Sequence, residues 1–247
     1  MKRKKKRGRP APRPRRSFEL LWQPGVRRRR GPVAGMGRAD LVRAAIGIAD
    51  REGLAAVTMS RVAGELGVTT MALYRHVPGK GELVDLMTDA VFVNAPLSTG
   101  ADWRGEIARW ARADLALFQR HAWLHEAVMH GTAAGPHWLD WVESALRALS
   151  GAPVAPHEKF SVILLIDGHA RASAQVTSGA KMSGEWAANF GRVLARSMSD
   201  PRYRALAELA SGGSFAPAFE GEHSAFEFGL ARLLDGLAAT PVARAAT

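Results

Sequence analysis

Residues 59–76, MSRVAGELGVTTMALYRH, decide how the N-terminal part of this chain folds. They predict two short helices joined by a tight turn, because Gly67 can adopt the positive φ that ends a helix and Thr69 can cap the next helix. The second helix then presents short polar side chains, with Arg75 and His76, on a face that can reach base edges. Such an arrangement is typical of the helix-turn-helix unit that enters the major groove of DNA.

The segments on either side complete a small helical domain. Residues 38–52 carry apolar side chains at helical spacing, and Gly53 ends this segment. Thr58 is a good N-cap for the next helix. A Pro-Gly pair breaks the chain after the helix-turn-helix stretch, and residues 80–92 are again helical in pattern. We therefore expect a basic arm at residues 1–34, a helix-turn-helix domain at 35–95 and a separate domain at 96–247.

Beyond residue 102 the periodicity is helical throughout, without the alternation that strands require. The helices are expected at residues 103–121, 123–130, 136–149, 156–177, 185–198, 201–210 and 222–238. The predicted fold class is all-α. A three-helix helix-turn-helix domain would come first, followed by a larger helical domain.

Composition and hydropathy exclude several classes of protein. The 247 residues are 47% apolar and 23% charged, which is ordinary for a globular protein, and the absence of cysteine excludes disulfides and thiolate sites. The longest strongly apolar stretch, residues 162–166, is far shorter than the roughly 20 residues that span a bilayer. Arg15-Arg16 resembles a twin-arginine export signal, but the required apolar segment does not follow. We expect a cytoplasmic protein without membrane contact.

The positive charge is concentrated at the N-terminus. Residues 1–30 hold 14 Lys and Arg against one acid, Glu19, whereas the rest of the chain holds 20 against 22, a net charge of −2. This composition predicts a disordered arm, although residues 17–22 could make a small apolar contact. The arm either follows phosphates or a minor groove, or it is a solvated tail that adds only non-specific affinity. Met36 is an alternative start that would remove it.

Residues 58–92, TMSRVAGELGVTTMALYRHVPGKGELVDLMTDAVF, with the helix before them, resemble the TetR family of bacterial transcriptional repressors. The LGV turn, the LYRHV segment and the GK pair occur in the family's order and spacing. SVILLIDGHARASA and GGSFA with FEFGLARLLDGL more weakly resemble the tetracycline-repressor-type C-terminal domain of actinobacterial members. The arm motifs SFELLW and RRRRGP are similar to extensions in that subgroup, which favours a start before Met36.

The resemblance implies a homodimer whose small N-terminal domains bind DNA and whose C-terminal domains dimerise and bind an inducer. By position it implies phosphate contacts at Thr58, Tyr74, His76 and Lys80. It implies base contacts, or positions close to bases, at Ser60, Arg61, Thr69, Thr70, Ala72 and Arg75. Met71 offers an apolar contact to a thymine methyl. Arg75 is the best candidate for specificity, because a guanidinium can bind guanine O6 and N7 together. Tyr74 could instead pack in the core.

The C-terminal domain is rich in aromatic side chains, and with the implied inducer this predicts an aromatic cavity with a few polar groups. The candidate ligand-binding residues are Trp110, His125, Met129, Trp138, Trp141, His169 and Arg171. For any one of them, an ordinary core position is the alternative. Residues 157–177 and 222–237 carry small and apolar residues at a spacing that suits a four-helix dimer interface, although residues 167–169 could instead line the cavity.

No assembled catalytic motif is present. Gly79-Lys80 lacks the first glycine of a Walker loop, and no G-x-S-x-G occurs. His121 and His125 share a helix face and could hold a metal, but His121 lies at a helix junction where the TetR family has a similar histidine. We therefore expect no enzyme activity, no cofactor and no metal.

The expected function is a ligand-responsive repressor. A homodimer would bind a near-palindromic DNA operator in successive major grooves, and a small-molecule inducer would release it. Repression, as opposed to activation, rests on the resemblance. Two alternatives remain: a non-specific nucleic-acid or lipid binder that works through the arm, and an enzyme built on the C-terminal helices.

Overall fold

The computed structural model describes residues 17–22, 36–100, 102–131, 133–179, 184–198, 200–211 and 225–239. Its α-helices are α1 (Ser17–Trp22), α2 (Arg38–Glu52), α3 (Met59–Glu65), α4 (Thr70–Tyr74), α5 (Lys80–Val91), α6 (Trp103–Arg120), α7 (Leu124–Met129), α8 (Pro136–Ala148), α9 (Lys159–Gly179), α10 (Gly184–Ser197), α11 (Arg204–Ser211) and α12 (Ala225–Ala239). The described residues contain no strand, and the all-α prediction is confirmed. Most predicted helix ends agree to within one or two residues.

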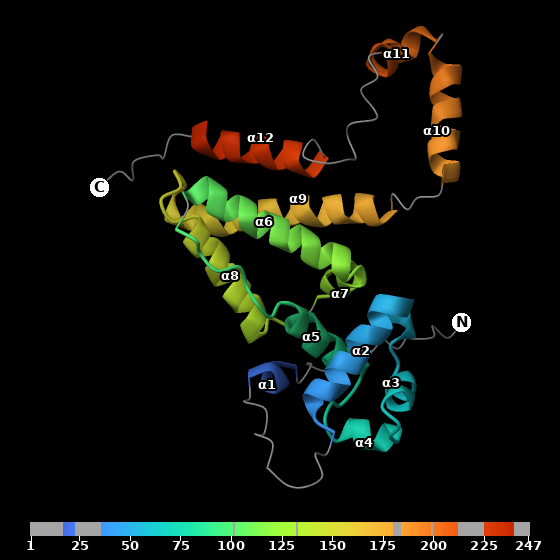
Figure 1. The fold of residues 1–247 in the computed structure, drawn as a ribbon, viewed down its shortest axis with the longest axis vertical. Coiled ribbons are helices and arrows are strands. Elements are labelled where there is room, and N and C mark those ends of the chain that lie inside the picture. The colour runs from blue at the N-terminus through green and yellow to red at the C-terminus, as the bar shows by residue number, and fades with distance from the viewer. Residues whose placement is uncertain are drawn as a thin grey trace, which may run out of the picture.

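Helices α2 to α5 form the N-terminal domain at one end of the molecule (Figure 1). Leu41, Val62 and Leu73 are fully buried at its centre. The Thr58 Oγ1 atom accepts a hydrogen bond from the Arg61 N–H at 3.1 Å and so caps α3. Thr69 caps α4 in the same way, and Gly67 has a φ of 66° in the turn. The predicted caps and turn are therefore confirmed, and they fix the angle between α3 and α4.

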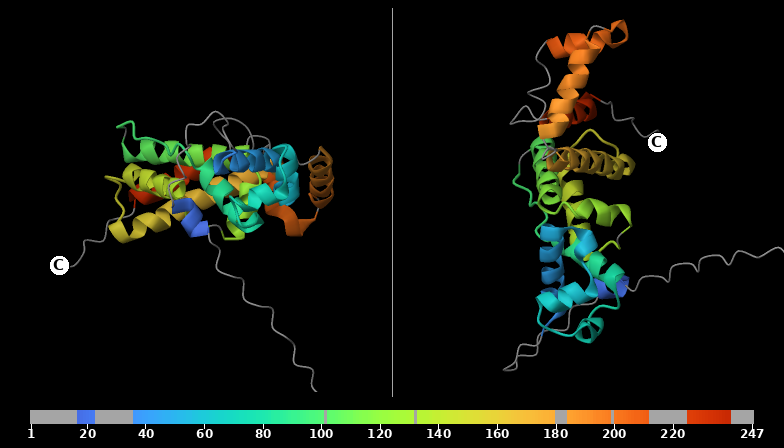
Figure 2. Two further views of the ribbon diagram at one scale, coloured as in Figure 1. Left: turned by 90° about the horizontal axis from the view of Figure 1, so that it is seen from below. Right: turned by 90° about the vertical axis from the view of Figure 1, so that its right-hand side faces the viewer.

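The C-terminal domain is built around α6 and α9, which pack along much of their length. Helix α8 covers one side of this pair and α12 lies along α9 (Figure 1). The buried side chains of Ile107, Phe118 and Ile166 fill the space between them. Helices α10 and α11 pack on each other and project away from this body (Figure 2). None of the described helices has the length and apolar character needed to cross a membrane.

Residues 17–22 form the helix α1, which corrects the prediction of a disordered arm over residues 1–34. The segment is helical because it packs against α5: Ser17 Oγ donates a hydrogen bond to the buried carboxylate of Asp85, and Leu21 is buried beside it. Trp22 Nε1 also donates to the Ala134 carbonyl at 3.2 Å. The small apolar contact expected of these residues is present. Residues 1–16 and 23–35 of the arm lie outside the described residues.

Aspartates of the N-terminal domain make the polar contacts between the two domains. Asp50 of α2 accepts a hydrogen bond from Trp123 Nε1 at 2.7 Å, and it lies 2.7 Å from His121 Nδ1. Asp85 of α5 accepts from the Ala133 N–H at 3.3 Å. His121 thus pairs with a carboxylate at the junction of α2 with α6 and α7.

Asp89 makes the third of these contacts, at the N-terminus of α8. Its Oδ1 accepts from the Trp138 N–H at 3.1 Å, and its Oδ2 lies 2.9 Å from His137 Nδ1. A helix N-terminus carries unpaired N–H groups and a partial positive charge, so a buried carboxylate is favoured there. Asp89 therefore attaches α5, the last helix of the N-terminal domain, to the first turn of α8.

Gly135 leaves the space that the Asp89 carboxylate occupies. A Cβ at residue 135 would overlap this carboxylate, with Oδ2 2.8 Å away, although the backbone φ of −102° accepts any residue. We predict that Gly135→Ala displaces Asp89 and lowers the free energy of unfolding by about 1–3 kcal/mol. Urea unfolding followed by circular dichroism measures the change.

Gly64→Ala is the matched control. No atom lies within 4 Å of a Cβ built at Gly64, which is inside α3. Alanine is favoured over glycine in a helix by about 1 kcal/mol, so this variant should be more stable than the wild type. A Gly135→Ala protein as stable as the wild type would contradict the importance of the Asp89 contact.

Candidate functional site

Helix α4 and its flanking residues present an exposed surface on the N-terminal domain. Met71 is 67% exposed and Tyr74 is 49% exposed, whereas Leu73 between them is buried in the core. Thr69 and Arg75, at the two ends of α4, are also exposed. The half-exposed ring of Tyr74 favours a surface contact over the alternative of core packing. Side chains on this face are exposed to solvent.

The structure separates the two candidate arginines. Arg61 is ion-paired with Glu52 at 2.8 Å and with Glu65 at 3.3 Å, and Arg51 binds Glu65 at 2.9 Å. The hydrogen bond from Arg61 lowers the pKa of the Glu52 carboxyl. This network braces α3 against α2. Arg75 has no ion-pair partner in the part of the chain that the structure describes, so its guanidinium remains available for DNA.

The other predicted DNA contacts divide by exposure and by partner. Thr58, Ser60 and Lys80 are exposed, whereas Thr70, Ala72 and His76 are partly buried. The hydroxyls of the two capping threonines already accept backbone hydrogen bonds. Lys80 Nζ donates to the Leu54 carbonyl at 3.1 Å and so holds the start of α5 against the residues that precede α3. A phosphate at Lys80 would share the ammonium with this carbonyl.

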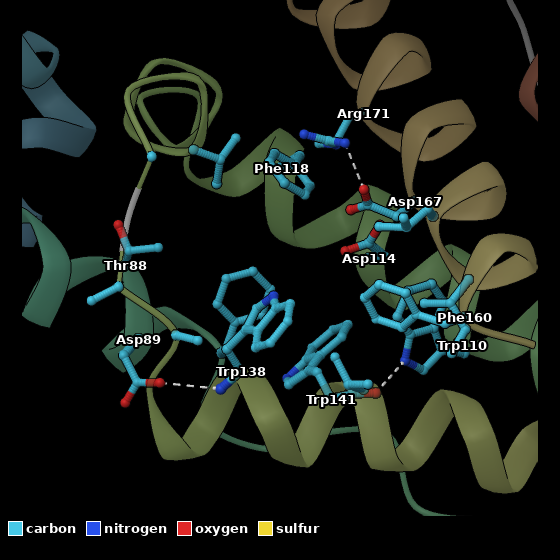
Figure 3. Close-up of a pocket in the computed structure, with 18 residues that line it drawn as sticks. Thr88, Asp89, Trp110, Asp114, Phe118, Trp138, Trp141, Phe160, Asp167 and Arg171 are labelled. Carbon is cyan, nitrogen blue, oxygen red and sulfur yellow. Dashed lines mark hydrogen bonds and ion pairs between the residues drawn. The ribbon is translucent and has the colours of Figure 1, made fainter. Parts of the chain in front are cut away.

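A cavity of about 320 Å³ lies between α5, α6, α8 and α9 (Figure 3). Its walls are largely aromatic and include Phe92, Trp110, Phe118, Trp138, Trp141 and Phe160. The rings of Phe92 and Trp110 meet Trp141 edge to face, with centroids 5.6 and 5.9 Å away. Trp110 Nε1 also donates to the Trp141 carbonyl at 3.1 Å. The volume is within the range of roughly 300–1,000 Å³ found for small-molecule sites.

Four of the residues predicted to bind a ligand line this cavity, namely Trp110, Trp138, Trp141 and Arg171. Met129, His125 and His169, which were also predicted to bind the ligand, are not among the residues that line this cavity. Met129 is 79% exposed, and the ring centroid of His125 lies 4.9 Å from that of Phe118.

His169 stacks on Phe226 of α12 and lies 2.9 Å from the Phe226 carbonyl oxygen through its Nε2 atom. The reason is helical phase. Residues two apart on a helix point about 200° apart, so the helix that directs Asp167 and Arg171 into the cavity directs His169 away from it.

The polar end of the cavity contains two carboxyl groups: Asp167, from the segment 167–169 that could line the cavity, and Asp114, which the sequence reasoning missed. Asp114 of α6 is 1% exposed, and Asp167 of α9 is ion-paired with Arg171 at 2.7 Å. Burial, followed by the charge of Asp167, raises the pKa of Asp114 well above its ordinary value. A signal existed in the sequence: Asp114 lies four residues from both Trp110 and Phe118, and therefore on the same apolar face of α6.

Unpartnered polar atoms gather at this cavity. Thr88 Oγ1, Asp114 Oδ2, Trp141 Nε1 and Arg171 Nε are buried and have no hydrogen-bond partner among the described residues. Only one further buried side-chain atom of this kind, His125 Nε2, occurs in the described ranges. Buried polar groups normally find partners, so their concentration around one cavity indicates a binding site. Thr88 and Asp89 come from α5, which also packs in the helix-turn-helix domain (Figure 3).

Comparison with known proteins covers both domains. Residues 41–87 match the family described as bacterial regulatory proteins, tetR family, and residues 95–240 match the tetracyclin repressor-like C-terminal domain. The HTH-type transcriptional repressor DrrR1 of Streptomyces coeruleorubidus is 40% identical over 235 residues, which are 90% of this chain and 84% of the relative. The tetracycline repressor protein class A from transposon 1721 of Escherichia coli is 27% identical over 206 residues, which are 80% of this chain and 88% of the relative.

Solved structures agree with this assignment. Apo ActR from Streptomyces coelicolor has a TM-score of 0.70 and 25% identity, and covers 84% of this chain and 97% of its own. ActR in complex with actinorhodin has a TM-score of 0.71 and 26% identity over the same shares. BioQ with its double-stranded DNA operator has a TM-score of 0.53 and 25% identity, over 83% of this chain and 99% of its own. This chain therefore belongs to the tetR family of bacterial regulatory proteins and is a DNA-binding transcriptional repressor, not an enzyme.

Proposed function

We propose that this protein represses transcription as a homodimer that binds a near-palindromic operator and is released by a small-molecule inducer. The observation that carries the proposal is the position of α5. This helix packs in the helix-turn-helix domain and also supplies Thr88 and Asp89 to the wall of the cavity. A ligand that contacts this wall could therefore change the position of the DNA-binding domains. By linkage, operator binding and inducer binding would oppose each other by the same factor.

The recognition helices of a dimer would enter successive major grooves about 34–36 Å apart. In this proposal the surface residues Thr58, Tyr74, His76 and Lys80 contact phosphates, and Ser60, Thr69, Thr70, Met71, Ala72 and Arg75 contact bases or lie close to them. Arg61 mainly braces α3 through its ion pairs with Glu52 and Glu65. Arg75 makes the largest contribution to discrimination between the operator and other base sequences.

The exposed apolar faces of α9 and α12 support dimerisation through these helices. Leu164 and Leu165 of α9 are 50% and 51% exposed, and Phe228 of α12 is 65% exposed. The two helices lie side by side (Figure 1), and Leu164, Leu165 and Leu233 line one groove between them. Exposed apolar patches of this kind mark interaction sites.

The C-terminal cavity is the proposed inducer site. Its aromatic walls and unpartnered polar atoms have the character of a small-molecule site. The solved complex of ActR with actinorhodin supports a role in small-molecule binding for this chain.

The basic arm is proposed to add attraction that does not depend on base sequence. The chain beyond residue 30 has a net charge of −2, so long-range attraction to DNA falls to the +13 of residues 1–30. In this division, the arm raises affinity for any duplex and α4 selects the operator.

We predict that Arg75→Ala lowers affinity for the operator by about 5- to 150-fold, the equivalent of roughly 1–3 kcal/mol for a lost bidentate contact with guanine. Fluorescence anisotropy would be measured with a duplex that the wild-type protein selects from a random pool. Arg147→Ala, an exposed arginine on α8, is the matched control and should bind as the wild type does. Both variants should remain dimeric in sedimentation experiments. Wild-type affinity of the Arg75→Ala protein would refute the proposed readout.

Deletion of residues 1–16 removes ten Lys and Arg but leaves α1 in place. The deleted protein should bind the selected duplex more weakly. The slope of log affinity against log salt should become shallower by about 0.9 for each phosphate contact that is lost. The preference for the selected duplex over a scrambled one should persist. Loss of that preference would favour the alternative of a non-specific binder that works through the arm.

The substitution Asp114→Asn tests how much the buried acid lowers the free energy of unfolding. The raised pKa means that folded Asp114 keeps its proton to a higher pH than unfolded Asp114, which ionises near about pH 4. The contribution of Asp114 to stability should therefore fall as the pH rises above about 4, by up to about 1.4 kcal/mol per pH unit until the raised pKa is reached.

The Asp114→Asn variant avoids this loss. It should be more stable than the wild type at pH 7, and the difference should shrink towards pH 4, as measured by urea unfolding at several pH values. Asp140→Asn, at an exposed position on α8, should show no such trend. A difference in stability that does not vary with pH would contradict the raised pKa.

A further inference from the structure

We propose that the polar end of the cavity binds a protonated amine carried by an aromatic ligand. The carboxylates of Asp114 and Asp167 would hold the ammonium, and the tryptophan and phenylalanine walls would hold the aromatic rings. This inference rests on the proposed function, because it specifies the chemistry of the inducer. It assigns a positively charged group to an inducer whose binding site is otherwise largely apolar.

The balance of charges at this end of the cavity carries the proposal. Asp167 and Arg171 neutralise each other across 2.7 Å. Asp114 is 1% exposed, and its Oδ2 atom has no hydrogen-bond partner in the described part of the chain. Figure 3 shows Asp114 and Asp167 side by side at the cavity wall, one from α6 and one from α9. Two acids face one guanidinium, so the cluster lacks one positive charge.

A proton on Asp114 supplies this charge in the free protein, where it is hydrogen-bonded to Asp167, since burial and the charge of the neighbouring Asp167 raise the pKa of Asp114. An ammonium can replace that proton. On binding, the O–H bond of Asp114 breaks, the proton passes to solvent, and the carboxylate accepts a hydrogen bond from the ligand's N–H. The ligand keeps its own positive charge, so one positive charge enters the site and one leaves. Charge-assisted hydrogen bonds of this kind are stronger than neutral ones.

Other charged groups around Asp114 do not fill this role. From α9 they are Asp167 and Arg171, which are paired. From α7 comes His125, whose pKa is lowered by burial and by the charge of Arg171, so its neutral form is favoured. The lining residues of α8 are uncharged, and Asp89 of α5 is occupied at the N-terminus of α8. An anionic ligand would instead face the two carboxyl groups.

The opposite side of the cavity suits the aromatic part of the ligand. Trp141 Nε1 is a buried donor without a partner among the described residues, and Thr88 Oγ1 is a second unpartnered atom on the α5 side. Ring oxygens on the ligand could accept a hydrogen bond from either group. The aromatic walls between the two polar ends can stack with a planar ring system and can also stabilise a nearby cation.

The test compares three probes with one ring system. Aminomethylanthracene is cationic, hydroxymethylanthracene is neutral and anthracenecarboxylic acid is anionic. Energy transfer from the cavity tryptophans to anthracene reports their binding to the full chain. At pH 8 the amine should bind at least about tenfold more tightly than the alcohol, and the acid most weakly. Between pH 6 and 8 the affinity for the amine should rise by up to about tenfold per pH unit, because one proton is released, while that for the alcohol stays constant.

Two variants test the residues. Asp114→Asn and Asp167→Asn each leave one carboxylate for Arg171, so each should abolish the preference for the amine while changing affinity for the alcohol by less than about threefold. Asp140→Asn, the exposed control on α8, should keep the preference. Circular dichroism establishes that each variant is folded, and either variant alone suffices for the test. A preference that persists in a folded variant would overturn the proposal.

The outcomes also separate this inference from the proposed function. If the alcohol or the acid binds the wild type as tightly as the amine, the amine site is refuted and the cavity remains a ligand site. If none of the three probes binds, the amine site is refuted, whereas the proposed repressor function is tested independently by the Arg75→Ala variant. If the amine binds as predicted but does not release the operator duplex, the amine site is supported and the proposed inducer role of the cavity is refuted.

Discussion

In the proposed function, coupling between the cavity and the DNA-binding domain depends most on the hydrogen bond from the Trp138 N–H to Asp89. Asp89 belongs to α5, whose Leu83 and Met87 are fully buried, and α5 packs against α2 in the N-terminal domain. Trp138 belongs to the first turn of α8 and lines the cavity. The carboxylate meets unpaired N–H groups and the positive end of the α8 dipole, so the contact is favourable where it lies and costly to break. In the proposed function, a change in the cavity wall reaches α5 through this contact.

Charge is used in three different ways along the chain. In the proposed function the arm supplies bulk attraction to a polyanion and a few side chains on α4 supply selection, since the chain beyond residue 30 is slightly acidic. The cavity contains an acid, Asp114, that burial makes unfavourable in its ionised form. A group that lowers stability and faces a cavity is typical of a functional site, where stability is lost in exchange for binding.

Local patterns were sufficient to predict the helix-turn-helix unit, because its caps and its turn depend on residues close in sequence, such as Thr58, Gly67 and Thr69. The sequence also predicts an aromatic cavity with a few polar groups, and three of the tryptophans that line it are among the predicted residues. His169 was misplaced because the sequence does not fix the rotation of α9 about its axis. The helix α1 was not predicted because the basic residues on both sides of it have a composition typical of disordered segments. The contact between Asp89 and α8 joins residues 49 apart and leaves no local pattern.

Communication between the cavity and the DNA-binding domains is tested most directly by the distance between those domains in the dimer. The chain has no cysteine, so Ala55→Cys, at an exposed position before α3, gives one spin label per subunit for double electron–electron resonance. We predict that saturating aminomethylanthracene changes the distance between the two labels, and that Asp89→Ala strongly reduces this change. An unchanged distance with the probe bound in the cavity, or the same change in the Asp89→Ala protein, would contradict transmission through α5 and α8.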